Sequence, residues 1–345
     1  MAPDKQTPPL DFEDLPKKPE EIHLERHGAL LLLAARTLMA ELFAHGQEIH
    51  PLAVFPDLAQ IFSNFVGGAD TPVAAVFEQR RILLDSLLTL AVLSTEQPIG
   101  IPGGEDEFRE FTLALTACTA SQSYGSIRRL SITIVHSHPS QVTRFRLIRR
   151  VLEDDDLRPI KDSAVSWLKH EILDAAAHAS DSNIFLSPHY FSAILPSLFS
   201  YNDLSLNVSS EIVTSWFKFS QTLVPSLHAS LSLLYLLISS PALREQLQLE
   251  KSIVYLRRMA LEPLKSLCHA FESDLTQNGG EGRIEAAVDM WEIGMSRSVG
   301  LISHVLGQVE DAAGEAFAPV DAEIQEPTAD DIARVEAIRR ETSPL

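Results

Sequence analysis

The sequence predicts an all-α protein, an irregular HEAT/armadillo-like α-solenoid built from stacked helix pairs. The clearest sign is the stretch 145–173, where apolar residues recur at helical spacing on both sides of the acidic turn 153–156. Helix breakers recur every few tens of residues, which suits HEAT-like units of ~40–47 residues. Almost no segment shows the alternation of a half-buried strand. Because a helix pair cannot bury its apolar stripe alone, the pairs must stack on one another.

The first part of the chain is a tail followed by predicted helices. Residues 1–19 are polar and rich in proline, and Pro8, Pro9, Pro16 and Pro19 prevent a regular helix, so we expect a disordered tail. Gly67-Gly68 and the Pro- and Gly-rich stretch 97–104 separate the helices that follow. These helices are predicted over Glu20–His45, Pro51–Val66, Pro72–Ser94 and Glu105–Ala120.

The middle of the chain contains one ambiguous segment and the helix pair. Leu130–Val135 is rich in β-branched residues, which favour a strand, but its neighbours are helical and we predict a helix. The pair comprises one helix that starts near Phe145 and a second that begins near Pro159 and reaches Leu173.

The last part of the chain continues the helical series. Helices are predicted over Pro188–Tyr201, Ser209–Ser240, Ala242–Gln277 and Glu281–Gly307, and Pro225 should end or kink one of them. We therefore divide the chain into a tail over 1–19, a solenoid over 20–310 and an acidic, mostly disordered tail over 311–345. A short helix from Thr328 to Arg340 can form within that last tail.

Composition excludes several classes of function. The 345 residues are 45% hydrophobic and carry a formal net charge of −19, which repels nucleic-acid phosphates and anionic membranes. Leu30–Leu42 and Leu223–Ile238 are apolar but too short or too interrupted to span a bilayer, so we interpret both as buried helices. The first residues lack a signal-peptide pattern and the chain has two cysteines. We expect a soluble, cytoplasmic protein, with the nucleus as an alternative location.

His136-Ser137-His138-Pro139 is the most enzyme-like feature of the sequence. It is similar to the zinc-binding core of JAMM-type deubiquitinating metalloproteases, in which a downstream serine and aspartate follow the second histidine. Arg146 and Arg149 occupy those two positions here, and a cation opposes a metal ion. A zinc isopeptidase is therefore a remote alternative, and a histidine–proline turn between two helices is the favoured interpretation. We expect no catalytic residue, metal or cofactor.

A local basic cluster follows this turn in an otherwise acidic chain. Its members Arg149 and Arg150 lie four residues before Glu153 and Asp154, so pairing within the helix is the favoured interpretation. Arg144 and Arg146 lack such partners, so we expect both to lie on the exposed surface, where they could dock an acidic segment. Together with the two histidines, they give a candidate partner-binding set of His136, His138, Arg144 and Arg146.

Other reactive groups favour structural interpretations. Cys118 and Cys268 lie among apolar residues and are expected to be small core residues rather than redox groups. Trp167, Trp216 and Trp291 lie on apolar helix faces, which indicates core packing. Gly-rich phosphate loops and nucleophile elbows are absent from the sequence.

A family resemblance rests on blocks between residues 134 and 173. These are Ile134, His136-Ser137-His138-Pro139, Thr143-Arg144-Phe145, Leu147-Ile148-Arg149, Val151-Leu152-Glu153-Asp154-Asp155, Ser163-Ala164, Trp167-Leu168-Lys169 and Glu171-Ile172-Leu173. The run resembles a fungal member of the YAP-binding/Alf-type/glomulin family. The resemblance implies a HEAT-like repeat fold without catalytic residues.

The resemblance also implies what such a protein binds. Fungal relatives bind an AP-1-like stress transcription factor and support its oxidation after peroxide, or associate with the kinetochore. Glomulin and its plant relative bind the RING subunit of cullin ubiquitin ligases and block ubiquitin transfer. We therefore expect a non-catalytic adaptor in the response to oxidative stress. The alternatives are a glomulin-like inhibitor of a cullin-RING ligase and a kinetochore-associated protein.

Overall fold

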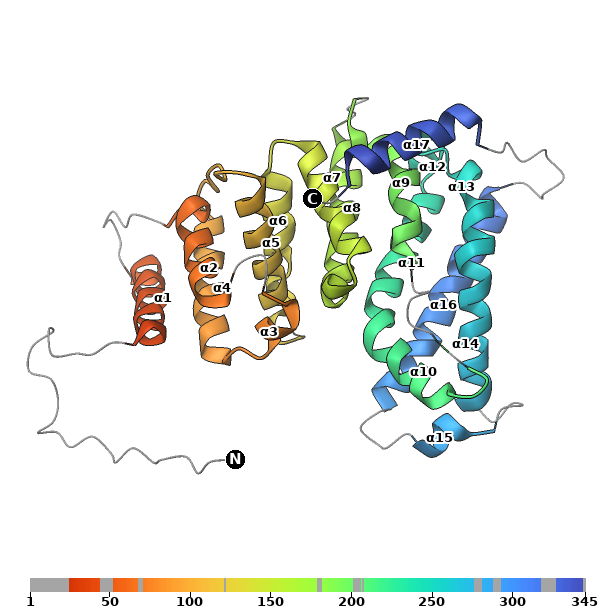
Figure 1. The fold of residues 1–345 in the computed structure, drawn as a ribbon, viewed down its shortest axis with the longest axis horizontal. Helices are drawn as coiled ribbons and strands as arrows, with labels where there is room; N and C mark the ends of the chain where they lie inside the picture. Colours follow the sequence, from red (N-terminus) through yellow and green to blue (C-terminus); the bar gives the residue numbers. More distant parts are fainter. Residues whose placement is uncertain are drawn as a thin grey trace, which may run out of the picture.

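The computed structural model shows an elongated array of helices that runs from α1 (Arg26–Phe43) at one end to the C-terminal helices at the other (Figure 1). It describes residues 25–43, 52–67, 71–120, 122–178, 182–200, 206, 208–275, 281–287, 293–317 and 327–343. Within these ranges the chain forms helices and no strand, which confirms the predicted all-α solenoid.

Most helices in the first half of the array lie within segments that the sequence predicted to be helical. The helices after α1 are α2 (Ala59–Val66), α3 (Val73–Phe77), α4 (Arg81–Thr95), α5 (Glu105–Thr119), α6 (Arg129–Ser137), α7 (Gln141–Glu153) and α8 (Lys161–Ala177). The ambiguous segment 130–135 lies within α6, so the helical interpretation is confirmed. The predicted helix over 72–94 is in fact two helices, because Arg80 adopts an extended backbone conformation between α3 and α4.

The second half contains the longest of the described helices, α16 (Ile293–Ala316). The helices of this half are α9 (Pro188–Leu198), α10 (Ile212–Lys218), α11 (Val224–Ser239), α12 (Pro241–Gln246), α13 (Leu249–Leu256), α14 (Glu262–Leu275), α15 (Arg283–Ala287), α16 and α17 (Ala329–Glu341). The predicted helix over 242–277 is divided, because Gln248 has a left-handed backbone with φ of 48° between α12 and α13.

Wide helical turns interrupt the predicted long helices without ending them. A π-helical turn over Phe219–Leu223 joins α10 to α11, directly before Pro225. Proline cannot donate a backbone hydrogen bond and therefore disturbs the regular α-helical pattern. The π-helical turn lies close to Pro225, where the sequence predicted an end or a kink of the helix. A second π-helical turn over Arg257–Leu261 joins α13 to α14.

The core is continuous along the array because each helix packs on its neighbours. α7 packs on α8, α8 packs on α11, and α11 packs on α16. The two largest fully buried side chains are those of Trp167 and Trp216, as expected from their apolar faces. Trp291 lies outside the described residues. The indole Nε1–H of Trp167 donates to the Ser131 hydroxyl at 3.0 Å, which joins α8 to α6.

The two apolar segments that resemble membrane spans differ in burial. Within the described part of the chain, one helix, Ile212–Ser239, is long and apolar enough to cross a bilayer, but half of its most apolar window is buried inside the protein. The prediction of a buried helix over Leu30–Leu42 was wrong in large part. Only Leu30 and Ala34 of α1 are buried, because α1 packs mainly on one helix, α4.

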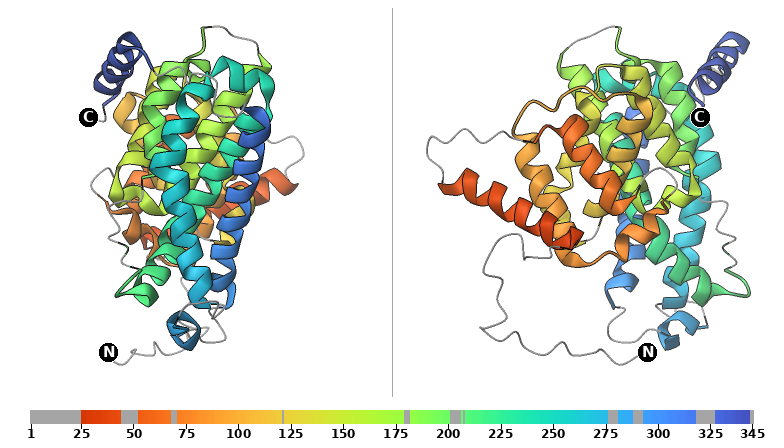
Figure 2. Two further views of the ribbon diagram at one scale, coloured as in Figure 1. Left: turned by 90° about the vertical axis from the view of Figure 1, so that its right-hand side faces the viewer. Right: turned by 60° about the vertical axis from the view of Figure 1, so that its left-hand side comes forward.

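The described residues of the C-terminal region are mainly helical. α16 continues past the expected boundary at residue 310, and Val309 and Ala313 are buried, so part of the region 311–345 belongs to the array. The predicted short helix is present as α17, which a capping box between Thr328 and Asp331 begins. Both views in Figure 2 show α17 on the outside of the packed helices. The predicted tail over 1–19 lies outside the described residues.

Candidate functional site

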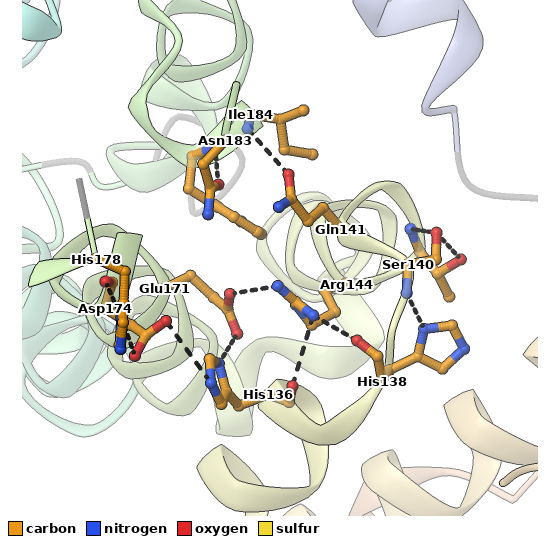
Figure 3. Close-up of polar contacts among 12 residues, drawn as sticks. His136, His138, Ser140, Gln141, Arg144, Glu171, Asp174, His178, Asn183 and Ile184 are labelled. Atoms are coloured by element: carbon orange, nitrogen blue, oxygen red, sulfur yellow. Dashed lines mark hydrogen bonds and ion pairs between the residues drawn. The ribbon is translucent and has the colours of Figure 1, made fainter. Parts of the chain in front are cut away.

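The candidate residues lie where α6, α7 and α8 meet. Ser140 begins α7, and its hydroxyl accepts a hydrogen bond from the backbone N–H of Thr143 at 3.2 Å, as expected of an N-cap serine. The sharp turn between α6 and α7 brings His136, at the end of α6, close to Arg144 in the first turns of α7 (Figure 3).

Glu171 of α8 is the centre of the polar contacts at this junction. Its side chain is 2% exposed and lies 3.0 Å from Arg144, measured from Oε2 to Nη2. Oε1 of the same carboxylate lies 3.0 Å from Nδ1 of His136. Because a carboxylate only accepts, His136 must carry its proton on Nδ1. Figure 3 shows both side chains directed toward Glu171.

Arg144 is buried, so the prediction of a freely exposed arginine was wrong. Its side chain is 9% exposed, and its guanidinium also donates to the backbone carbonyls of His138 and His136. The guanidinium also lies over the ring of Phe185, 5.9 Å from the ring centroid. These contacts hold the α6–α7 turn against α8, and they leave little of the Arg144 side chain accessible to a partner protein.

His138 has a structural environment different from that of His136. Its Nδ1 accepts a hydrogen bond from the backbone N–H of Ser140 at 3.2 Å, and its ring packs on Phe108 with 4.5 Å between centroids. Burial lowers the pKa of His138 below its ordinary value, which favours the neutral ring at neutral pH. The His136 ring is directed to Glu171 instead, so the two histidines do not converge on a common point (Figure 3).

The two arginines at the positions of the metalloprotease motif bind carboxylates. Arg146 Nη1 lies 2.7 Å from Glu105 of α5, and Arg149 Nε lies 2.7 Å from Glu153, as predicted for the latter pair. Among the described residues, no group of three His, Cys, Asp or Glu side chains could hold a metal ion. The geometry supplies an ion-pair network in place of zinc ligands.

The partly accessible side chains of the junction face two sides, because His136 faces α8 whereas Arg146 faces α5 and α17. His136 is 37% exposed and its Nε2 lies 3.7 Å from Asp174, while the Arg146 side chain is 26% exposed. The His170 ring packs edge-on against His136, with 5.0 Å between centroids. His136 can offer a hydrogen bond to a partner, and Arg146 can offer hydrogen bonds and positive charge to an acidic segment.

Glu171 is the central residue that sequence reasoning missed. It lies between Leu168 and Ile172 on the buried face of α8. A charged residue at a buried helical position is rarely left unpaired, so its position in the apolar pattern was a signal of an ion pair.

Both cysteines are buried, as predicted. Cys118 is 0% exposed and Cys268 is 1% exposed. Burial raises the pKa of each thiol to about 12. A thiol that stays protonated at neutral pH is a poor nucleophile, which fits a packing role.

Comparison with known proteins gives a family for this arrangement. A family model described as an uncharacterised protein family, YAP/Alf4/glomulin, matches residues 1–305. The chain belongs to this family. No curated protein and no solved structure matches the chain. The YAP/Alf4/glomulin family is one of non-enzymatic binding proteins, so the chain has a protein-binding role.

Proposed function

We propose that the chain is a non-catalytic adaptor that binds a regulatory protein in the cellular response to oxidative stress. The match of a YAP/Alf4/glomulin family model to residues 1–305 carries the proposal. Support comes from the elongated helical array, because solenoids offer extended surfaces for protein partners. The regulatory protein that we propose is an AP-1-like stress transcription factor, which the family resemblance implies.

The proposed contact residues are His136, His138 and Arg146, whose side chains are all partly accessible. Arg144 holds the α6–α7 turn that carries the two histidines, because its guanidinium binds Glu171 and the carbonyls of that turn. Arg146 already binds a carboxylate, Glu105, which is 50% exposed and can be exchanged for a partner's carboxylate at small cost. An acidic segment of the partner could therefore bind Arg146.

The test is affinity capture of the tagged full chain from its own cells, with and without peroxide. We compare the wild type with Arg146→Glu and with a matched control, Arg109→Glu. Arg109 lies on α5, is 23% exposed and also binds a carboxylate, that of Asp106. Arg146→Glu should capture several-fold less of the stress factor, whereas the control should capture as much as the wild type.

Two results would contradict the proposal at different levels. Equal capture by all three chains, with unchanged helicity, would remove the proposed surface. Peroxide-independent capture of cullin, RING or kinetochore subunits, without a stress factor, would remove the stress function.

A second candidate function is inhibition of a cullin-RING ubiquitin ligase, because the description of the matching family includes glomulin. It requires direct binding to the RING subunit. In a reconstituted reaction, excess chain should slow ubiquitin transfer, and an unchanged rate would exclude this candidate.

A further inference from the structure

α17 lies across the surface of the array at one end of α9 and α13 (Figure 1). Between α17 and these two helices is a cavity of about 280 Å³. We define the α9–α13 groove by four lining residues beneath α17, which are His189, Leu195, Lys251 and Tyr255.

Polar contacts hold the first turn of α17. Asp331 Oδ1 lies 3.0 Å from His189 Nε2, and Asp331 Oδ2 lies 3.7 Å from Lys251 Nζ. His189 lies on α9 and Lys251 lies on α13, so one carboxylate in the first turn of α17 binds both walls of the groove. The groove therefore selects a helix that carries an acid near its N-terminus.

Polar contacts also hold the last turn of α17. Arg149 of α7 donates from Nη1 to the carbonyl of Arg339 at 2.6 Å and to the hydroxyl of Thr342 at 2.9 Å. Arg146 donates to the carbonyl of Glu341 at 3.4 Å. Because the last carbonyls of any helix lack intrahelical partners, these arginines can receive the C-terminal end of a helix of any sequence.

The apolar contacts of α17 are weak in comparison. No residue within the helix is buried, and Ile332 is 49% exposed although it lines the cavity. Val335 also lines the cavity, so the space beneath α17 is only partly filled by its two apolar side chains. A helix with larger side chains at these positions would bury more apolar surface in the same groove.

The family match separates the groove from the helix that occupies it. Residues 1–305 match the family model, and they include α7, α9 and α13. α17 lies beyond the match. The groove thus lies within the residues that match the family, whereas the helix that occupies it lies outside them.

We propose that the α9–α13 groove is a binding site for a partner helix and that α17 occupies it within the same chain. The partner is an amphipathic helix with an acidic residue in its first turn and bulky apolar side chains at the positions of Ile332 and Val335. This deepens the proposed adaptor function and rests on it. α17 acts as an internal competitor whose departure exposes the groove.

A partner helix fits the charges better than a second copy of the chain. The groove offers Lys251, His189 and the two arginines of α7, which suit the acidic start and the C-terminal carbonyls of an incoming helix. A second copy brings a net charge of −19 toward another chain of −19, which opposes association.

The test measures whether α17 blocks the groove in the full chain. The probe is a fluorescein-labelled peptide of residues 327–343, and its binding is followed by fluorescence anisotropy. Ile338→Asp should release α17, because Ile338 packs against the core. Ala337→Asp is the matched control, because Ala337 is adjacent and exposed and receives the same charge.

We expect Ile338→Asp to bind the probe at least tenfold more tightly than the wild type or Ala337→Asp, since apparent affinity rises with the open fraction of the groove. Adding Lys251→Glu to the released chain should weaken binding at least threefold. A probe with Val335→Phe should bind several-fold more tightly by filling the cavity. Amide exchange should accelerate within α17 and stay unchanged in α9.

Equal probe affinity for the wild type and Ile338→Asp would overturn the proposal, as would Lys251→Glu without effect. Light scattering that shows wild-type dimers with exchanged α17 would replace the partner helix with a second copy. These outcomes are distinct from failure of the adaptor function. Peroxide-dependent capture by the chain would persist if the groove alone were wrong.

Discussion

The buried pair between Arg144 and Glu171 gives the sharpest prediction on stability. Glu171 is 2% exposed and Arg144 is 9% exposed, so neither charge is solvated if the other is removed. Removing one partner of a buried ion pair costs about 3–5 kcal/mol, because the remaining charge stays buried without compensation. In Glu171→Leu, Arg144 keeps the carbonyls of His136 and His138 as acceptors. We therefore expect the unfolding free energy of this variant to fall by about 3 kcal/mol, the lower end of that range.

A variant that carries both Glu171→Leu and Arg144→Met measures the coupling energy between the two side chains. Arg144→Met leaves Glu171 with His136 as its partner, and we expect a similar loss of about 3 kcal/mol in unfolding free energy. If the two losses were independent, the double variant would lose about 6 kcal/mol. Replacing a buried pair by apolar side chains of similar volume is often tolerated, so we expect a total loss of only about 3 kcal/mol.

Urea unfolding followed by circular dichroism at 222 nm measures these values for the wild type, both single variants and the double variant. An unchanged slope of free energy against urea would show that the variants unfold from the same compact state. The coupling energy should be about 3 kcal/mol, at the upper end for residues in contact. A coupling below about 0.5 kcal/mol would refute the conclusion that this pair holds the junction of α6, α7 and α8.

Two further predictions concern the thiols and the start of α7. Because the buried thiols of Cys118 and Cys268 have pKa values raised to about 12 while an unfolded thiol ionises near 9, stability should fall as pH rises from 9 toward 12. A Cys118→Ala/Cys268→Ala chain should lose part of that pH dependence in thermal unfolding, and an identical profile would contradict it. Ser140→Ala should lower the unfolding free energy by about 1 kcal/mol through loss of the N-cap. Ser166→Ala, at an exposed position inside α8, should change it by less than about 0.5 kcal/mol, and equal losses would argue against the cap.

Local signals in the sequence predicted most of the helices. Apolar spacing and breakers act over a few residues, which is why the helix over 105–120 and the kink near Pro225 were found. The capping residues Thr328 and Asp331 likewise mark the start of α17 within four residues of sequence. The divided helices depended on single backbone conformations, such as that of Gln248, which residue type does not fix.

Contacts between distant segments could not be predicted in the same way. Arg144 was expected to be exposed because no acid lies one helical turn away, but its partner Glu171 is on another helix. Arg149 was paired correctly with Glu153 at four residues, whereas its bond to the carbonyl of Arg339 joins residues that are 190 positions apart in the sequence. The apolar pattern around Glu171 indicates that this buried charge has a partner, but it does not indicate which distant residue the partner is.

α17 also has a mechanical consequence for the array. A helix of 13 residues is about 20 Å long, and its two ends are bound to α7 at one end and to α9 and α13 at the other. Stacked repeats bend by small rotations between neighbouring units, and a helix that crosses several units resists such rotations. The curvature of this part of the array is therefore coupled to α17, and the array should be stiffer when α17 is seated than when it is released.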